Sequence, residues 1–217
     1  MKKGIIVFNL KNYLESSIEN SLKILKELES LKDNRIYLAP PINSLDYLNS
    51  RKHYCKIISQ TIDVKEAGAH TGSISLEVLM KNKVNGSLLN HSEKRVDKKL
   101  IKEICKSTQK TNFETIVCCE NLKEASELQK FNPKFIAYEP KELIGSGISV
   151  STSKPEIVTS FSKKIRNPLI GAGITSIKDV EKGIELGAKG FLIASAFIKS
   201  NDKKKYTQNI LDILDTI

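Results

Sequence analysis

Four polar side chains come directly after short apolar runs of the chain, at points where strands would end. Glu139 follows one such run, His91 follows another, and Asn9 and Lys11 follow the first run of the chain. In α/β proteins the carboxyl ends of parallel strands form the edge where ligands bind. A carboxylate, an imidazole and an ammonium at one edge would supply a base, an electrophile and a positive charge for proton abstraction.

Small residues follow the last two apolar runs, and they suit an anion. Gly171-Ala172-Gly173 and Ala194-Ser195 stand where backbone N–H groups and the start of a short helix can hold a phosphate. Gly145-Ser146-Gly147, just beyond Glu139, has the glycines of a loop that can move over a ligand. Together these residues favour proton abstraction next to the carbonyl of a phosphorylated sugar. An ordinary strand, turn and helix with a solvated glutamate remains open for residues 135–156.

The apolar runs recur eight times, and each is followed by a turn and an amphipathic segment. They are Gly4–Phe8, Arg35–Ala39, Tyr54–Gln60, Gly86–Leu89, Thr115–Cys119, Phe135–Tyr138, Leu169–Gly171 and Gly190–Ala194. Eight strand–helix units with no hairpin signal predict an α/β fold, a closed parallel (β/α)8 barrel in a single domain over residues 1–217. An open doubly wound sheet is the alternative, but no Gly-x-Gly-x-x-Gly follows the first run.

Helix starts are marked by a serine or asparagine with an acidic residue three positions later. This capping pattern occurs at Ser16–Glu19, Asn121–Glu124, Ser153–Glu156 and Ser176–Asp179. Each of these pairs precedes apolar residues at helical spacing, so each predicts a helix between two strands.

Composition limits the classes of function. The net charge is +10, but the lysines are scattered along the predicted helices and mixed with glutamates, and no basic stretch is interleaved with aromatic residues, which argues against nucleic-acid binding. No apolar run reaches the roughly 18 residues of a membrane span, and the basic start Met1–Lys3 lacks the apolar core of a signal peptide, so we expect a cytoplasmic protein. The four cysteines include no Cys-x-x-Cys pair and are expected to be reduced and buried.

Seven motifs follow one another along the chain at or near the predicted strand ends: Asn9–Lys11, Ala39–Pro41, Gly68–Gly72, Leu88–Glu93, Ala137–Gly147, Gly171–Ile174 and Ala194-Ser195. With these motifs the chain resembles the triosephosphate isomerase family along essentially its whole length. The short length and the Asn90–Glu93 and Gly171–Gly173 motifs look like the compact archaeal branch of that family. The family's (β/α)8 TIM barrel agrees with the fold predicted from the repeats.

The resemblance implies the interconversion of dihydroxyacetone phosphate and D-glyceraldehyde 3-phosphate in glycolysis and gluconeogenesis, with no metal and no cofactor. It makes Glu139 the base that moves a proton between two neighbouring carbons and His91 a neutral electrophile. By the same resemblance, Lys11 adds positive charge and Asn9 contacts substrate oxygens. The phosphate would be bound by the backbone N–H groups of Ile144, Gly173, Ala194 and Ser195. The resemblance also implies that the loop beyond Glu139 closes over the substrate. Closure keeps water away from the enediolate, which would expel phosphate if it were exposed.

A long connection, Thr61–Gly72, suggests an oligomer. Connections between strands and helices commonly span ~2–6 residues, and longer loops are usually functional. The resemblance implies that this loop inserts beside a neighbouring subunit's active site. We therefore expect at least a homodimer, with Thr71 of one chain near Lys11 of the other, and the archaeal branch often pairs dimers into tetramers.

Three positions depart from the family's usual pattern. Leu10 replaces an aromatic residue and is expected to pack below the site. Lys141-Glu142 stands where many lids have an aromatic hinge. Ala196 replaces a glycine, which would crowd the phosphate loop if that backbone needs a positive φ.

Two other functions compete with the isomerase. Another barrel enzyme acting on a phosphorylated metabolite would need a Schiff-base lysine within a strand or a set of metal ligands, and of the three histidines only His91 stands at a strand end. A binding protein that had lost activity should have lost Lys11, His91 or Glu139, and all three are present.

Overall fold

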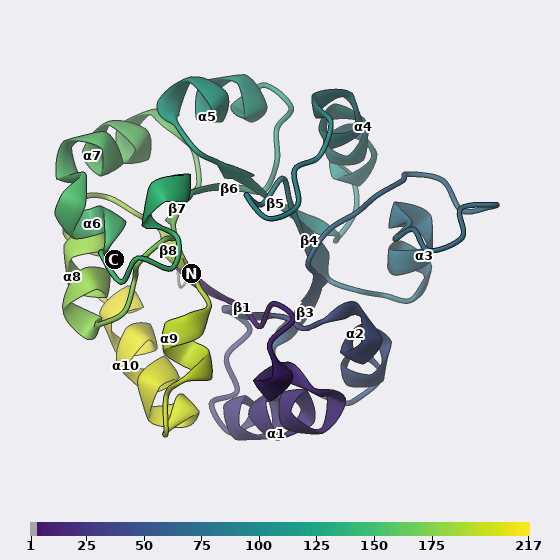
Figure 1. Ribbon diagram of the computed structural model, residues 1–217, viewed down its shortest axis with the longest axis horizontal. Helices are drawn as coiled ribbons and strands as arrows, with labels where there is room; N and C mark the ends of the chain where they lie inside the picture. The colour runs from purple at the N-terminus through teal and green to yellow at the C-terminus, as the bar shows by residue number, and fades with distance from the viewer. Residues whose placement is uncertain (1–3) are drawn as a thin grey trace.

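The chain forms a closed barrel of eight parallel strands with helices around it (Figure 1). This computed structural model describes residues 4–217, so the expectation for Met1–Lys3 lies outside the described residues. Strands pair in chain order, and β1 closes the ring against β8. The predicted (β/α)8 TIM barrel is confirmed, and the open sheet is excluded by that closing pair.

The strands agree closely with the eight apolar runs. They are β1 Ile5–Asn9, β2 Ile36–Ala39, β3 Lys56–Ser59, β4 Gly86–Leu89, β5 Glu114–Cys119, β6 Phe135–Tyr138, β7 Pro168–Ile170 and β8 Gly190–Ile193. Alternate residues of each strand face opposite sides. In β1, for example, Ile5 and Val7 belong to the cluster that fills the barrel, whereas Ile6 and Phe8 pack with the helices outside.

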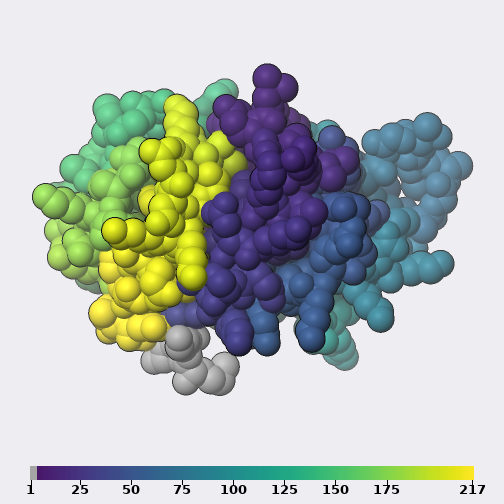
Figure 2. All heavy atoms as spheres, turned by 90° about the horizontal axis from the view of Figure 1, so that it is seen from below, coloured from purple at the N-terminus to yellow at the C-terminus, as the bar shows by residue number. Residues whose placement is uncertain are grey.

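The helices lie on the outer face of the barrel. They are α1 Ile18–Glu29, α2 Ile42–Asn49, α3 Leu76–Lys81, α4 Lys98–Thr108, α5 Leu122–Gln129, α6 Val150–Ser153, α7 Pro155–Lys164, α8 Ile177–Glu185, α9 Ser195–Ile198 and α10 Lys203–Leu214, with 3-10 turns η1 Leu14–Ser16 and η2 Lys141–Leu143. In the space-filling view, α1 (purple) and α10 (yellow) lie side by side and close the ring from outside (Figure 2).

Two predicted helix starts are confirmed and two are wrong. Ser176 and Asp179 form a full capping box on α8, and the Asn121 side chain accepts from the Glu124 N–H at the start of α5. Helix α1, however, is capped by Ser17, one residue after the predicted start. The prediction at Ser153 fails because the chain first forms α6, capped by Ser149, so that Ser153 ends that helix instead of starting the next one.

Candidate active site

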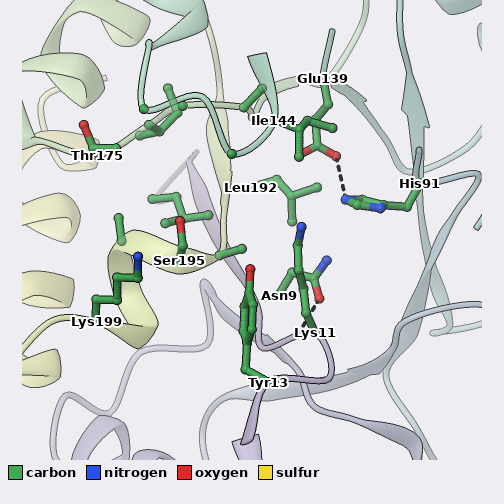
Figure 3. A pocket seen from close by; sticks show the side chains of 18 residues that line it. Asn9, Lys11, Tyr13, His91, Glu139, Ile144, Thr175, Leu192, Ser195 and Lys199 are labelled. Atoms are coloured by element: carbon green, nitrogen blue, oxygen red, sulfur yellow. Dashed lines mark hydrogen bonds and ion pairs between the residues drawn. The ribbon is translucent and has the colours of Figure 1, made fainter. Parts of the chain in front are cut away.

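A cavity of about 380 Å³ opens at the carboxyl ends of the strands. All eight residues singled out from the sequence line it: Asn9, Lys11, His91, Glu139, Ile144, Gly173, Ala194 and Ser195. In the close-up, Glu139, His91 and Lys11 lie on one side of the cavity, and Ser195 and Thr175 lie on the other (Figure 3). The barrel therefore separates a chemically reactive side from a side of small residues.

Glu139 is the buried carboxylate of the reactive side. It follows β6 directly and is 6% exposed, and its Oε2 atom has no hydrogen-bond partner among the described residues. Burial raises the pKa of Glu139, and the nearby His91, Cys118 and Lys11 only partly oppose that effect. A carboxylate with a raised pKa accepts a proton more readily, and a free oxygen leaves room for a substrate C–H.

His91 faces Glu139 across the edge of the cavity. Its Nε2 atom lies 3.6 Å from Oε2 of Glu139. Its Nδ1 atom accepts a hydrogen bond of 3.2 Å from the Glu93 N–H, whereas the Glu93 carboxylate is 3.8 Å away, too far for a hydrogen bond. Since Nδ1 is used as an acceptor, the proton of the neutral ring is carried by Nε2 and faces the cavity.

Lys11 is held from three directions. Its backbone has a φ of 47°, in the left-handed region, and its N–H donates to Oδ1 of Asn9 at 3.0 Å. The Gln60 amide donates to the Lys11 carbonyl at 3.1 Å. The ammonium lies 2.6 Å from Oε1 of Glu93, and the side chain is 14% exposed. Such support offsets the backbone strain and keeps a positive charge beside the reactive side.

The small-residue side is made by the loops after β7 and β8. Ala172 and Gly173 have φ values of 66° and 67°, and Ser195 is the first residue of α9. A Cβ on Gly173 would collide with the Ile148 carbonyl oxygen, so only glycine allows this close approach. The Ile144 N–H donates to the Lys141 carbonyl at 3.2 Å, and it would reach a phosphate only after that turn opens.

Comparison with known proteins agrees with this geometry. The family model described as triosephosphate isomerase matches residues 4–215. The chain is 40% identical to the triosephosphate isomerase of Methanothermus fervidus over 97% of this chain and 99% of that protein. It is 38% identical to that of Thermoplasma volcanium, over 95% and 98% of the two chains. The chain belongs to the triosephosphate isomerase family.

Members of this family are aldose–ketose isomerases, and all three of the relatives considered are archaeal. The third, the triosephosphate isomerase of Methanobrevibacter smithii, is 35% identical over the full length of both chains. The similarity therefore covers every strand end that lines the cavity, and the resemblance to the family stated from the motifs is confirmed.

Segment 144–148, which the resemblance makes a lid, is exposed at residues 145–148 and half-buried at Ile144. Gly145 and Gly147 have φ values of 74° and 76°, which other residues rarely adopt. The hinge residues that replace the family's aromatic lie in η2, where Glu142 forms an ion pair with Lys154 near the start of α7. That ion pair connects η2 to the residue that precedes α7.

The other two departures from the family pattern are compatible with the site. Leu10 is fully buried, but it packs with the helices outside the barrel and not below the site. Ala196 lies within α9 and is not among the residues with a positive φ, so it does not strain the phosphate loop. The positive φ falls at Ala172 instead, a strained position that the sequence analysis did not identify.

Several cavity residues were missed by the sequence analysis. Tyr13, Thr175 and Lys199 line the cavity, and Glu93 and Gln60 hold Lys11. Gln60 directly follows β3, so the rule that places ligand sites at strand ends could have found it. Lys199 follows α9 and carries no comparable signal, because exposed lysines are frequent in this chain.

A second cavity, of about 430 Å³, adjoins the first. It shares Asn9, Lys11 and His91 with the first cavity and extends to Thr61 and Gly72. The Thr61 hydroxyl is buried and has no hydrogen-bond partner among residues 4–217. The long loop before α3 projects away from the barrel, as both overall views show (Figures 1 and 2).

Within residues 4–217, no helix combines the length and the apolar character that crossing a bilayer requires. In the same residues, no three histidine, cysteine, aspartate or glutamate side chains are grouped so that they could hold a metal ion.

Proposed function

We propose that this chain interconverts dihydroxyacetone phosphate and D-glyceraldehyde 3-phosphate as a triosephosphate isomerase of glycolysis and gluconeogenesis. The observation that carries the proposal is the pair formed by Glu139 and His91. A buried carboxylate oxygen with no hydrogen-bond partner in the described part of the chain lies 3.6 Å from a ring nitrogen, at the edge of a cavity large enough for a triose phosphate. Family membership supplies the identity of the substrate.

Glu139 is the base in the proposed mechanism. It takes a proton from the carbon next to the substrate carbonyl and returns it to the neighbouring carbon. The raised pKa of this buried carboxyl brings its basicity closer to that needed for proton transfer at neutral pH. The carboxylate is also positioned by the β7 loop, since a Cβ on Gly171 would lie 2.6 Å from its Oε1 atom.

His91 and Lys11 stabilise the enediolate. The Nε2–H of His91 donates to the oxygen on which negative charge develops, because Nδ1 is held by the Glu93 N–H. Lys11 adds a fixed positive charge, and Asn9, whose Oδ1 is occupied by the Lys11 N–H, offers its amide N–H group to a substrate oxygen. Glu93 supports both His91 and Lys11, so it couples the two groups.

The phosphate binds on the small-residue side. We assign it to the backbone N–H groups of Gly173, Ala194 and Ser195, and to Ile144 once the lid has closed and its N–H has left the Lys141 carbonyl. Closure excludes water from the enediolate. The substrate thus spans the cavity, with its reacting carbons at Glu139 and its phosphate near α9.

We further propose that two copies of the chain assemble through the loop around Thr71. The second cavity supports this assembly because it borders Lys11 and is lined by Thr61, whose hydroxyl has no hydrogen-bond partner within residues 4–217. Nearby apolar side chains are exposed, including Leu14 at 93% and Ile42 at 56%. Burying them against a partner would remove apolar surface from water. A tetramer and a cytoplasmic location stay predictions.

A coupled assay tests the activity. D-glyceraldehyde 3-phosphate is supplied, and the dihydroxyacetone phosphate formed is reduced by glycerol-phosphate dehydrogenase with loss of NADH absorbance. We expect turnover without added metal, and unchanged turnover after treatment with a chelator. Absence of turnover in the folded chain would favour the binding-protein alternative, and turnover of a different sugar phosphate would favour another barrel enzyme.

A further inference from the structure

Asn90, the residue before His91, has an unusual conformation and an unusual number of hydrogen bonds. It is 3% exposed and has a φ of 60°, in the left-handed region that asparagine tolerates better than most residues. Its Nδ2 atom donates to the Cys118 carbonyl at 3.0 Å, and its Oδ1 accepts from the Val96 N–H at 3.3 Å. The peptide that carries His91 is therefore anchored by the preceding side chain.

The hydrogen bond from the Asn90 side chain to the Cys118 carbonyl continues the pairing of β4 with β5 beyond their last paired residues. The last paired residues of β4 and β5 are Leu89 and Val117. Beyond this pair the left-handed turn at Asn90 takes the backbone out of the ladder, and its side-chain amide donates to the next carbonyl of β5. The chain can thus leave the strand sharply at His91 without leaving that buried carbonyl unsatisfied.

Glu124 and Arg95 complete the anchor from outside the barrel. Oε1 of Glu124, on α5, accepts from Nδ2 of Asn90 at 3.1 Å and also from Nη2 of Arg95. Arg95 returns to the start of the loop, because its Nη1 donates to the Asn90 carbonyl at 3.3 Å. The Oε2 of Glu124 is occupied by the Glu120 N–H at 2.8 Å. Asn90, Arg95 and Glu124 therefore form a closed ring of hydrogen bonds.

We infer that Asn90, Arg95 and Glu124 are positioning residues that aim the Nε2–H of His91 at the substrate oxygen. The inference rests on the proposed function for its kinetic consequence. None of the three residues lines the cavity, so they act only through His91. The ring holds the backbone before His91, and the Glu93 N–H holds the far side of the imidazole. Both ends of this short turn are fixed, which sets the direction of Nε2.

The test removes the anchor and keeps the backbone conformation. Asn90→Gly allows the same positive φ but deletes all the side-chain hydrogen bonds. We expect kcat to fall about 10- to 100-fold, because misplacement of a catalytic group by about 1 Å has effects of this size. KM should change by less than about threefold, since the phosphate is held on the other side of the cavity.

A matched control is provided by Asn132, at the opposite end of the barrel. It also has a positive φ, 59°, and its Oδ1 accepts from Nη1 of Arg166 at 2.7 Å, whereas the Oδ1 of Asn90 accepts from the Val96 N–H. Asn132 is exposed, so Asn132→Gly should cost less stability than Asn90→Gly, and it should leave kcat unchanged. If it lowers kcat as much as Asn90→Gly does, the effect is a general loss of stability and the inference fails.

A second readout does not depend on turnover. The imidazole signal of His91 in a ¹⁵N NMR spectrum, assigned by its loss in His91→Gln, reports which ring nitrogen carries the proton. We expect a single Nε2-protonated form in the wild type and a shifted or mixed signal in Asn90→Gly. An inactive wild type would refute the proposed function, and the NMR comparison would then decide the inference by itself.

Two further variants cover the case in which Asn90→Gly does not fold. Arg95→Met removes both hydrogen bonds that Arg95 makes in the ring, and Glu124→Gln removes the charge that faces Arg95 and one of the two acceptor oxygens. Each variant should lower kcat with KM nearly constant. The inference is overturned if the folded variants keep kcat within about twofold of the wild type with an unchanged His91 signal, because loss of positioning must appear in transition-state stabilisation.

Discussion

Replacing Glu139 by glutamine tests the reaction and the energetics of the site together. Glu139→Gln keeps the shape of the side chain but removes both its charge and its ability to accept a proton. The wild-type carboxylate is 6% exposed, and its Oε2 atom has no hydrogen-bond partner among the described residues. The substitution should therefore abolish catalysis. It should also remove the free-energy cost of burying a charge.

The catalytic effect follows from the role of a general base. Such a group contributes roughly 10²- to 10⁴-fold to the rate. We expect a loss in kcat of about 10³-fold, equal to about 4 kcal/mol of barrier height, since each factor of ten corresponds to about 1.4 kcal/mol. KM should change little, because Glu139 lies on the reactive side and the phosphate is bound on the other side.

The stability effect has a defined sign and pH dependence. The pKa of Glu139 is raised above its ordinary value of 4.5 by burial, so the folded state favours the protonated form. The contribution of this group to the free energy of unfolding is complete below the ordinary pKa and is lost as the pH rises through the raised one. Each unit of raised pKa corresponds to about 1.4 kcal/mol. Glutamine stays neutral, so the variant avoids this loss.

Two measurements decide this prediction. The coupled assay gives kcat, and thermal unfolding at a series of pH values gives the difference in stability between the variant and the wild type. The difference should move in favour of Glu139→Gln from acid to neutral pH. A folded variant that keeps more than about a tenth of wild-type activity would refute Glu139 as the base, since general-base catalysis is worth at least about 10²-fold. A stability difference that does not depend on pH would contradict the conclusion that burial raises the pKa of Glu139.

Three other predictions concern the groups around the base. Gly171→Ala places a Cβ 2.6 Å from Oε1 of Glu139 and should therefore displace the carboxylate. We expect kcat to fall about 100-fold, as for other misplaced catalytic groups. A kcat equal to that of the wild type would show that the carboxylate is not held there. Phosphoglycolate should protect residues 144–147 from protease, and cleavage at the same rate with and without it would argue against a closing lid. Thr71→Arg should dissociate the oligomer and lower activity, as light scattering and the coupled assay would measure; a fully active wild-type monomer at micromolar concentration would defeat the proposed assembly.

The repeat of apolar runs was enough to predict the barrel. Each strand has the length and apolar content of a segment buried on both faces, and each amphipathic segment can only bury its apolar side against the sheet. Polar residues at strand ends were equally informative, because parallel strands bring their carboxyl ends to one edge. Glu139, His91, Lys11 and Asn9 were identified in this way, and the structure places all four on one cavity.

Local helix signals were less reliable where two elements compete. At residues 149–156 the capping pattern Ser153–Glu156 predicts a helix that starts at Ser153. In the structure Ser149 caps α6, and Pro155, which lacks an N–H, stands at the start of α7. The start of α6 packs against the loop after β7, where the Val150 N–H donates to the Ala172 carbonyl. This contact between distant parts of the chain favours a helix start at Ser149.

The sequence by itself determined which groups can react and at which strand ends they stand, because residue type and the strand repeat are local properties of the chain. Only the tertiary structure decided the state of those groups. Burial raises the pKa of Glu139, and the Glu93 N–H selects the tautomer of His91. The hydrogen-bonded ring of Asn90, Arg95 and Glu124 holds the turn that carries His91. Desolvation and hydrogen-bond direction depend on atoms from several strands and helices, and these meet only when the barrel closes.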